Sequence, residues 1–157
     1  EYARLTGSER VVDAYCGVGT IALFLARQAR EVVGVERLAA AAADALQNAI
    51  LNGLRHVSFL AGAAEEVLPR LLRRGHRPDV VVLDPPRGGC HPMVLEALAR
   101  HGVPRVVYLS CQPGTLARDL GRLASGGYRL GEVQPVDVFP QTHHVECVAL
   151  LEFAGQG

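Results

Sequence analysis

Short apolar runs alternate with amphipathic segments along most of this chain. Runs rich in β-branched residues predict buried strands, and the segments between them carry apolar residues at the three- and four-residue spacing of a helix face. Strands that alternate with helices in this way favour a parallel sheet with helices on both faces. The expected strands are 11–15, 32–36, 57–61, 80–84 and 106–110.

Each of the later helices carries an apolar stripe that we expect to face the sheet. Gly53, Gly75 and Gly102 follow expected helix ends, where the left-handed backbone that ends a helix favours glycine. Pro69 fits the third helix poorly, because proline lacks the N–H of the helical hydrogen bond, and it indicates a possible split there. The stripes are Leu46 and Ile50; Val67, Leu68, Leu71 and Leu72; Val94, Leu95 and Leu98; and Leu116, Leu120 and Leu123.

The pattern changes after the fifth helix. Residues 128–139 and 147–153 predict two strands with no convincing helix between them, so we expect an antiparallel, hairpin-like pair at the end of the sheet. Parallel strands followed by such a pair are typical of a seven-stranded methyltransferase-type sheet and differ from the six-stranded dinucleotide fold. The expected fold is therefore an α/β, Rossmann-like class I methyltransferase domain with an antiparallel last strand.

Composition is compatible with one folded domain, 1–157. The chain has 157 residues, 49% of them hydrophobic, and its 16 basic residues, all arginine, balance 16 acidic ones. A chain this long and this apolar buries a core, which excludes disorder. Because the net charge is zero, binding to RNA requires a local arginine patch, and we expect it to be weak in this segment alone.

The sequence predicts no membrane span and no leader. Apolar runs such as 80–83 are far shorter than the ~20 residues that cross a bilayer, so we expect a cytoplasmic protein. Because the chain starts at Glu1 and its first strand follows almost at once, we interpret it as a segment of a longer protein. The four cysteines form no C-x-x-C pair and are interpreted as free thiols, and no obligate protein partner is inferred.

A glycine-rich turn follows the first expected strand. Gly17 and Gly19 allow the backbone to approach a ligand at the start of a helix, and Glu36, which ends the second strand, can accept hydrogen bonds from ribose hydroxyls. Ligands of doubly wound sheets bind at the carboxyl ends of the strands, so this pattern indicates a nucleoside cofactor. Gly17-x-Gly19-x-x-Ala22 also satisfies a relaxed NAD fingerprint, and a tight turn without a ligand is a further alternative.

The segment Asp84-Pro85-Pro86-Arg87 follows the fourth expected strand. Its two prolines fix φ and stiffen the chain after the carboxylate, which predicts a rigid polar lip at the edge of the site. The segment resembles those with which nucleic-acid methyltransferases hold an extruded base. An ordinary turn at a strand end is the alternative.

Cys111 follows the fifth expected strand and precedes Pro113, a residue typical of the first position of a helix. The positive end of that helix favours the thiolate, which is the form that acts as a nucleophile. A buried core cysteine is the alternative interpretation, but Cys111 lies at the end of the strand and not inside it.

A second candidate group precedes the last strand. Glu146 is either a base or a solvated strand residue, and its sequence alone favours neither. His143, His144 and Cys147 lack a fourth ligand at a recognised spacing, so we expect no metal site.

Four segments together resemble the RNA uracil-5 methyltransferase family, over nearly the whole chain: 13–20, 84–87, 108–119 (with Thr115-Leu116-Ala117-Arg118-Asp119) and 139–146. The resemblance implies methyl transfer from S-adenosylmethionine to carbon 5 of a uridine in tRNA or rRNA. It implies that Cys111 is the nucleophile and Glu146 the general base, while Asp84, with Pro85 and Arg87, binds the uracil. The residues implied at the cofactor are Asp13, Tyr15, Gly17, Gly19, Thr20, Glu36 and Asp84.

The chain also departs from that family. Gln112 stands where the family usually has asparagine, and the family's upstream Phe-Gln-x-Asn segment, RNA-binding domain and, in some members, iron–sulfur cysteines are not in this sequence. Two other functions are alternatives. An NAD-dependent oxidoreductase leaves Cys111, Glu146 and Asp84 unexplained, and a non-catalytic Rossmann-like binding module leaves the cysteine and glutamate without a role.

Overall fold

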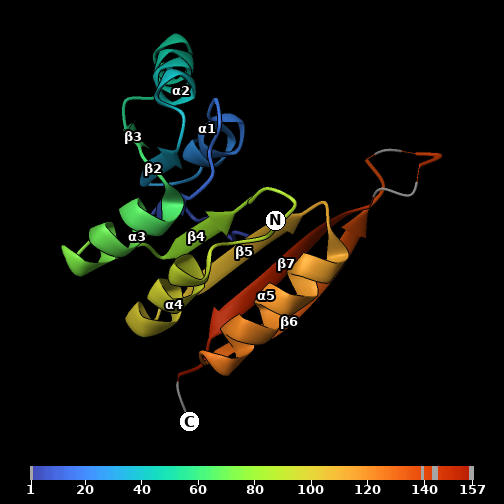
Figure 1. Cartoon of the computed structure of the whole chain (residues 1–157). Helices are drawn as coiled ribbons and strands as arrows, with labels where there is room; N and C mark the ends of the chain where they lie inside the picture. Colours follow the sequence, from blue (N-terminus) through green and yellow to red (C-terminus); the bar gives the residue numbers. More distant parts are fainter. Residues whose placement is uncertain (1, 139, 143–144, 156–157) are drawn as a thin grey trace.

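The computed structural model describes residues 2–138, 140–142 and 145–155. Its centre is a seven-stranded sheet with the order β3-β2-β1-β4-β5-β7-β6 (Figure 1). The first five strands are parallel, and β7 lies antiparallel between β5 and β6. The strands are β1 (Arg10–Asp13), β2 (Glu31–Glu36), β3 (Val57–Ala61), β4 (Val80–Leu83), β5 (Arg105–Ser110), β6 (Tyr128–Val136) and β7 (Glu146–Phe153). The predicted fold class and the antiparallel last pair are confirmed.

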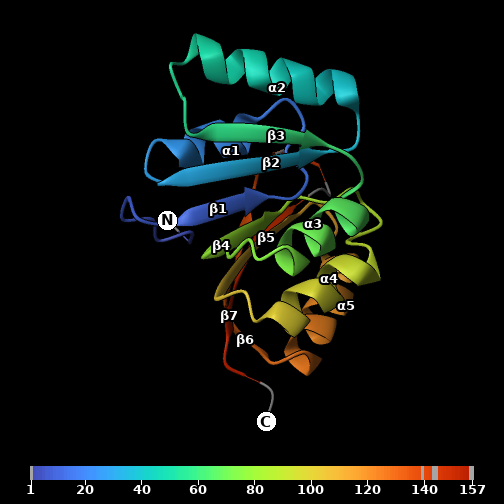
Figure 2. The same cartoon turned by 90° about the vertical axis from the view of Figure 1, so that its left-hand side faces the viewer.

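Helices cover both faces of the sheet, and Figure 2 shows α3, α4 and α5 stacked together on one of them. These helices pack on one apolar cluster, and α1 and α2 pack on another cluster with the opposite side chains of the same strands. The bounds are α1 (Thr20–Ala26), α2 (Ala39–Leu51), α3 (Ala64–Arg73), α4 (Pro92–His101) and α5 (Pro113–Ser125). In the part of the chain that the structure describes, no helix is long and apolar enough to cross a membrane.

Three strands end earlier than the sequence predicts. β1 ends at Asp13 and not at Tyr15, because the chain there leaves the ladder and enters the glycine turn. β4 ends at Leu83, immediately before Asp84, because the two prolines that follow have no N–H to donate to a neighbouring strand. β6 ends at Val136, short of the predicted 139.

The expected buried stripe of α2 is wrong. Leu46 is 44% exposed and Ile50 61% exposed, while the buried residues of this helix are Ala42, Ala45 and Ala49. Alanines on this face allow the helix to lie close to the glycine turn, since a Cβ added at Gly19 would lie 3.2 Å from the Cβ of Ala45. The stripes of α3, α4 and α5 do face the core.

Pro69 does not split α3, which runs unbroken from Ala64 to Arg73. The missing N–H removes one helical hydrogen bond, and burial of Pro69 among Val67, Leu68 and Leu72 holds the helix together in spite of that loss. The three predicted helix-ending glycines are confirmed, because Gly53, Gly75 and Gly102 all have positive φ (70°, 90° and 59°).

Candidate active site

The ends of five strands place the candidate residues in a row along one edge of the sheet. From the order of the strands, this row runs from Glu36 on β2, through Gly17 after β1 and Asp84 after β4, to Cys111 after β5. Glu146 completes it, because β7 is antiparallel and therefore begins at the edge where the other strands end. Asp84 thus stands between the glycine turn and the cysteine.

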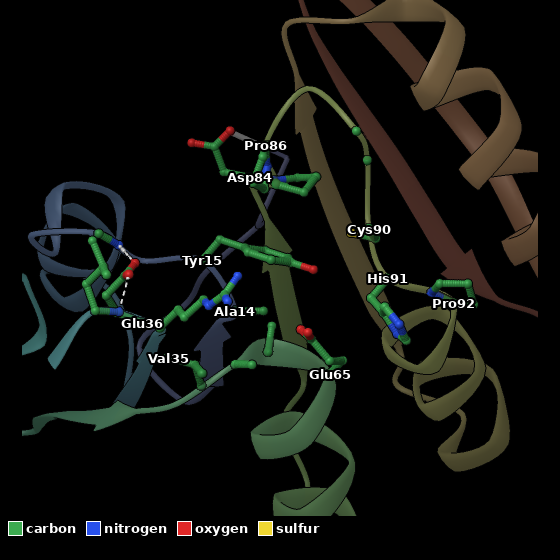
Figure 3. A pocket seen from close by; sticks show the side chains of 18 of the residues that line it. Ala14, Tyr15, Val35, Glu36, Glu65, Asp84, Pro86, Cys90, His91 and Pro92 are labelled. Atoms are coloured by element: carbon green, nitrogen blue, oxygen red, sulfur yellow. Dashed lines mark hydrogen bonds between the residues drawn. The ribbon is translucent and has the colours of Figure 1, made fainter.

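The glycine turn is fastened to the end of β2 by backbone and side chain. The N–H of Cys16 donates to the carbonyl of Val35 (3.0 Å), and Gly17 and Gly19 adopt φ of 54° and 90°, which favour glycine. The carboxylate of Glu36 accepts from the N–H of Gly17 (3.0 Å) and the N–H of Leu38 (2.8 Å), as Figure 3 shows. Each carboxylate oxygen has a second lone pair, so Glu36 can still accept from a ribose hydroxyl.

A cavity of about 1120 Å³ lies along this edge. In Figure 3, Glu36 lies at one end, Cys90 and His91 lie toward the other, and Tyr15 extends between them. Of the predicted site residues, the cavity is lined by Tyr15, Gly17, Glu36, Asp84 and Pro85. The predicted residues outside its lining are Asp13, Gly19, Thr20, Arg87, Cys111 and Glu146.

Asp13 lies beneath the site and not in it. Its side chain is completely buried at the end of β1, where one carboxyl oxygen accepts from the N–H of Tyr15 (3.4 Å) and the other has no hydrogen-bond partner. Burial raises its pKa from 3.8 to about 7, with a smaller contribution from the charge of Asp84. Thr20 begins α1 and Arg87 lies on the lip, and both are exposed.

Asp84 is exposed to the cavity at the end of β4. Its pKa is raised above the ordinary value, first by partial desolvation at the rim and second by the negative charge of Glu146. The charge of Glu146 thus acts on Asp84, although the two residues are 62 residues apart in sequence, from 84 to 146.

The pairing of β5 and β7 brings Cys111 and Glu146 to the same edge of the sheet. Their ladder ends at the pair Ser110 and Cys147; Cys111 follows the first of these residues and Glu146 precedes the second. Cys111 is half-buried and belongs to neither apolar cluster, whereas the other three cysteines are buried. Pro113 is the first residue of α5, as predicted, so the thiol lies close to the N-terminus of a helix. The buried-core interpretation of Cys111 does not hold.

Part of the last predicted motif lies outside the described residues. Phe139, His143 and His144 fall there. Cys147, the third residue considered with these histidines as a metal ligand, is buried in β7 and packs in the core.

Several residues that line the cavity were not predicted from the sequence. Leu38 lines it beside Glu36 although 65% exposed, and Ala63 and Glu65 line it at the start of α3. The rule that ligands bind at strand ends, applied to the end of β3 as well, points to residues 62–65. His91, before α4, carries no comparable signal in the sequence.

Comparison with known proteins identifies the family of this chain. The family model described as tRNA (uracil-5-)-methyltransferase matches residues 4–154. A curated relative, an uncharacterized RNA methyltransferase of Halalkalibacterium halodurans, is 55% identical over 152 residues, which are 97% of this chain and 33% of the relative. The chain thus spans about a third of the length of the curated relatives it matches.

Solved structures share the fold. The tRNA (uracil-54, C5)-methyltransferase of Pyrococcus abyssi, in complex with S-adenosyl-L-homocysteine, superimposes with a TM-score of 0.81 and 33% identity, covering 96% of this chain and 36% of that one. The precorrin-6y C5,15-methyltransferase of Geobacter metallireducens superimposes with a TM-score of 0.80 and 18% identity, covering 97% and 83% of the two chains. The fold is that of class I methyltransferases.

Proposed function

Because this chain belongs to the tRNA (uracil-5-)-methyltransferase family, we propose that it is the catalytic part of an RNA methyltransferase that methylates carbon 5 of a uridine. One observation carries the proposal: Asp84, Cys111 and Glu146 follow one another along the sheet edge, next to a cavity suited to a nucleoside. An oxidoreductase needs the glycine turn alone and gives these three side chains no task.

The first half of the cavity fits S-adenosylmethionine. Glu36 keeps free lone pairs for ribose hydroxyls, and the exposed side chain of Leu38 offers an apolar surface to a flat base. Gly17 leaves open space at the turn, where an added Cβ would meet nothing within 4 Å. When bound, this cofactor supplies an electrophilic methyl group on a sulfonium centre.

Cys111 makes carbon 5 of the uracil reactive. Its thiolate adds to carbon 6, and the electron pair of the 5,6-double bond moves to carbon 5 as an enolate-like centre. That carbon would take the methyl group of bound S-adenosylmethionine, with S-adenosylhomocysteine as the leaving group. The covalent step replaces one high barrier by two lower ones. A half-buried thiol beside a helix N-terminus suits this task, because it is reachable and close to positive backbone charge.

Glu146 completes the reaction as a base. It takes the proton from the methylated carbon 5, the double bond forms again, and the sulfur of Cys111 leaves as thiolate. Asp84 stands between the cofactor and the cysteine, where it accepts a hydrogen bond from the edge of the uracil. The target base reaches this position only after it leaves its stack in the RNA.

The test uses the full-length protein that carries this sequence, S-adenosylmethionine and RNA that contains 5-fluorouridine. Fluorine cannot leave as a proton, so the covalent adduct should accumulate and appear as a shifted protein band that peptide mapping assigns to Cys111. Cys111→Ser should abolish it, and Cys147→Ala, a change at a buried cysteine nearby, should retain it. Parallel reactions with tRNA and rRNA transcripts identify the class of substrate. Calorimetry that shows binding of NAD and not of S-adenosylmethionine would reverse the proposal.

A further inference from the structure

One buried carboxylate near the site has no role in the chemistry above. Asp119 lies on α5 with no exposed area. Its Oδ2 accepts from the hydroxyl of Tyr108 on β5 (2.6 Å) and from the N–H of Cys90 (2.8 Å), and its Oδ1 accepts from Nε of Arg118 (2.9 Å). A buried charge is costly unless hydrogen bonds compensate it, so this site holds its partners in one arrangement.

The same face of α5 holds the last residue of the lip, Arg87, and the residues that follow it. Thr115 donates from its hydroxyl to the carbonyl of Arg87 (3.1 Å), and Arg118 donates to the carbonyl of Gly88 (2.8 Å). Together with the bond from Cys90 to Asp119, these contacts bind Arg87, Gly88 and Cys90 to side chains within about one helical turn of α5. The segment from Arg87, the last residue of the lip, to Cys90 is therefore fastened to α5.

Gly89 makes this close approach possible. Its φ is +82°, and an added Cβ would lie 2.5 Å from Oδ2 of Asp119 and 2.4 Å from Nη2 of Arg118. Any side chain here would displace the carboxylate or the guanidinium. The glycine, the buried acid and the arginine thus form one joint between the lip and the helix.

The joint connects two catalytic parts of the proposed site. The lip begins with Asp84, and the fastened segment from Arg87 to Cys90 continues it. α5 begins two residues after Cys111, and Tyr108 lies on β5 three residues before Cys111. We propose that Asp119, with Tyr108, is a positioning residue that fixes the uracil-binding lip relative to Cys111. This inference rests on the proposed function, in which the uracil must lie between the two.

Tyr108→Phe provides the sharpest test, because the chain offers a matched control in Tyr128→Phe. Both tyrosines are buried, and the hydroxyl of Tyr128 donates to the carbonyls of Leu98 (3.2 Å) and Val103 (2.9 Å), far along the strands from the lip. The full-length variants are compared in the single-turnover rate of adduct formation on 5-fluorouridine RNA and in the dissociation constant of S-adenosylhomocysteine.

Displacements of about 1 Å cost on the order of 100-fold in rate. We therefore expect about a tenfold slower adduct for Tyr108→Phe, and about 100-fold slower for Asp119→Asn, which sets an amide N–H₂ against Arg118 or the Cys90 N–H. The affinity for S-adenosylhomocysteine should change by less than about threefold in both, because the nucleoside end of the cavity lies on β1 and β2. Tyr128→Phe should match the unaltered protein in both measurements.

Thr115→Val keeps the test valid if the buried variants fold poorly. It removes the bonds from the hydroxyl to the carbonyls of Arg87 and Gln112 (both 3.1 Å) at a partly exposed position and leaves the buried network intact. Slower adduct formation with unchanged cofactor affinity is expected. If the unaltered protein forms the adduct and Tyr108→Phe, Asp119→Asn and Thr115→Val form it as fast, the positioning role is refuted alone. If the unaltered protein forms none, the proposed function fails first.

Discussion

The two faces of the sheet are packed with side chains of different size. On one face, α1 and α2 bury alanines (Ala22, Ala26, Ala42, Ala45 and Ala49), and a positive-φ glycine turn lies against them. On the other face, α3, α4 and α5 bury leucines and valines around Tyr108 and Asp119. Small residues bring backbone close to a ligand, whereas large ones support polar side chains at the edge.

This difference predicts which changes each region tolerates. The glycine turn depends on residues without a Cβ atom, so a substitution that adds a side chain there should be harmful. The part of the sheet edge that carries Asp84, Cys111 and Glu146 depends on the functional groups of these side chains. Removing those groups should therefore be harmful even where the size of the side chain is preserved.

The largest effect is expected for Glu146→Gln, which keeps the size and removes the base. Turnover on natural RNA should fall by about 1000-fold, within the range typical of lost general-base catalysis. The first methyl transfer should survive, so that methylated RNA stays attached to Cys111 and appears as a stable adduct on denaturing gels. Rapid release of methylated RNA by this variant would exclude Glu146 as the base.

The pH dependence of the unfolding free energy tests the burial of Asp13 at the end of β1. Because the folded state raises the pKa of this carboxyl from 3.8 to about 7, the folded chain keeps a proton that the unfolded chain releases. The unfolding free energy should therefore fall as pH rises from about 4 to about 7, by about 4 kcal/mol, and the loss should remain above that range. In Asp13→Asn this part of the pH dependence should vanish.

Urea unfolding of both proteins at a series of pH values measures this. Parallel pH profiles for the unaltered protein and Asp13→Asn would show that the carboxyl is ionised at its ordinary pH in the fold. The prediction concerns the slope with pH alone, since asparagine changes the hydrogen bonds at this position at every pH.

A smaller effect is expected at Gly19, where φ is +90° and an added Cβ would lie 3.2 Å from both Ala45 and Phe59. Gly19→Ala should lower the unfolding free energy by about 2 kcal/mol, through a left-handed alanine and tight packing, and weaken S-adenosylhomocysteine binding about tenfold. Gly121→Ala is the matched control, because Gly121 lies in α5 in open space and alanine there should stabilise by about 1 kcal/mol. Equal changes in the unfolding free energy of Gly19→Ala and Gly121→Ala would contradict the special role of the glycine turn.

Much of the fold followed from local patterns. The β-branched runs, the glycines that end helices and Pro113 at the start of α5 each describe a backbone state that neighbouring residues determine. The burial of α2 did not follow, because Leu46 and Ile50 have the spacing of a core stripe and only the closeness of the sheet selects the alanines instead. The predicted split at Pro69 rested likewise on a local effect, the missing N–H of proline, and burial of Pro69 in α3 outweighs that effect.

The sequence by itself determined where the reactive groups stand relative to their own strands and helices: a carboxylate and two prolines after one strand, and a thiol before a helix. Only the tertiary structure decided which of them meet. β7 lies antiparallel between β5 and β6 and so brings Glu146 to the edge of the sheet at which Cys111 lies, and α5 folds back so that Asp119 reaches Cys90, after the lip. Local patterns fix backbone conformation, but contacts between distant residues depend on strand order and register, which no short stretch of sequence contains.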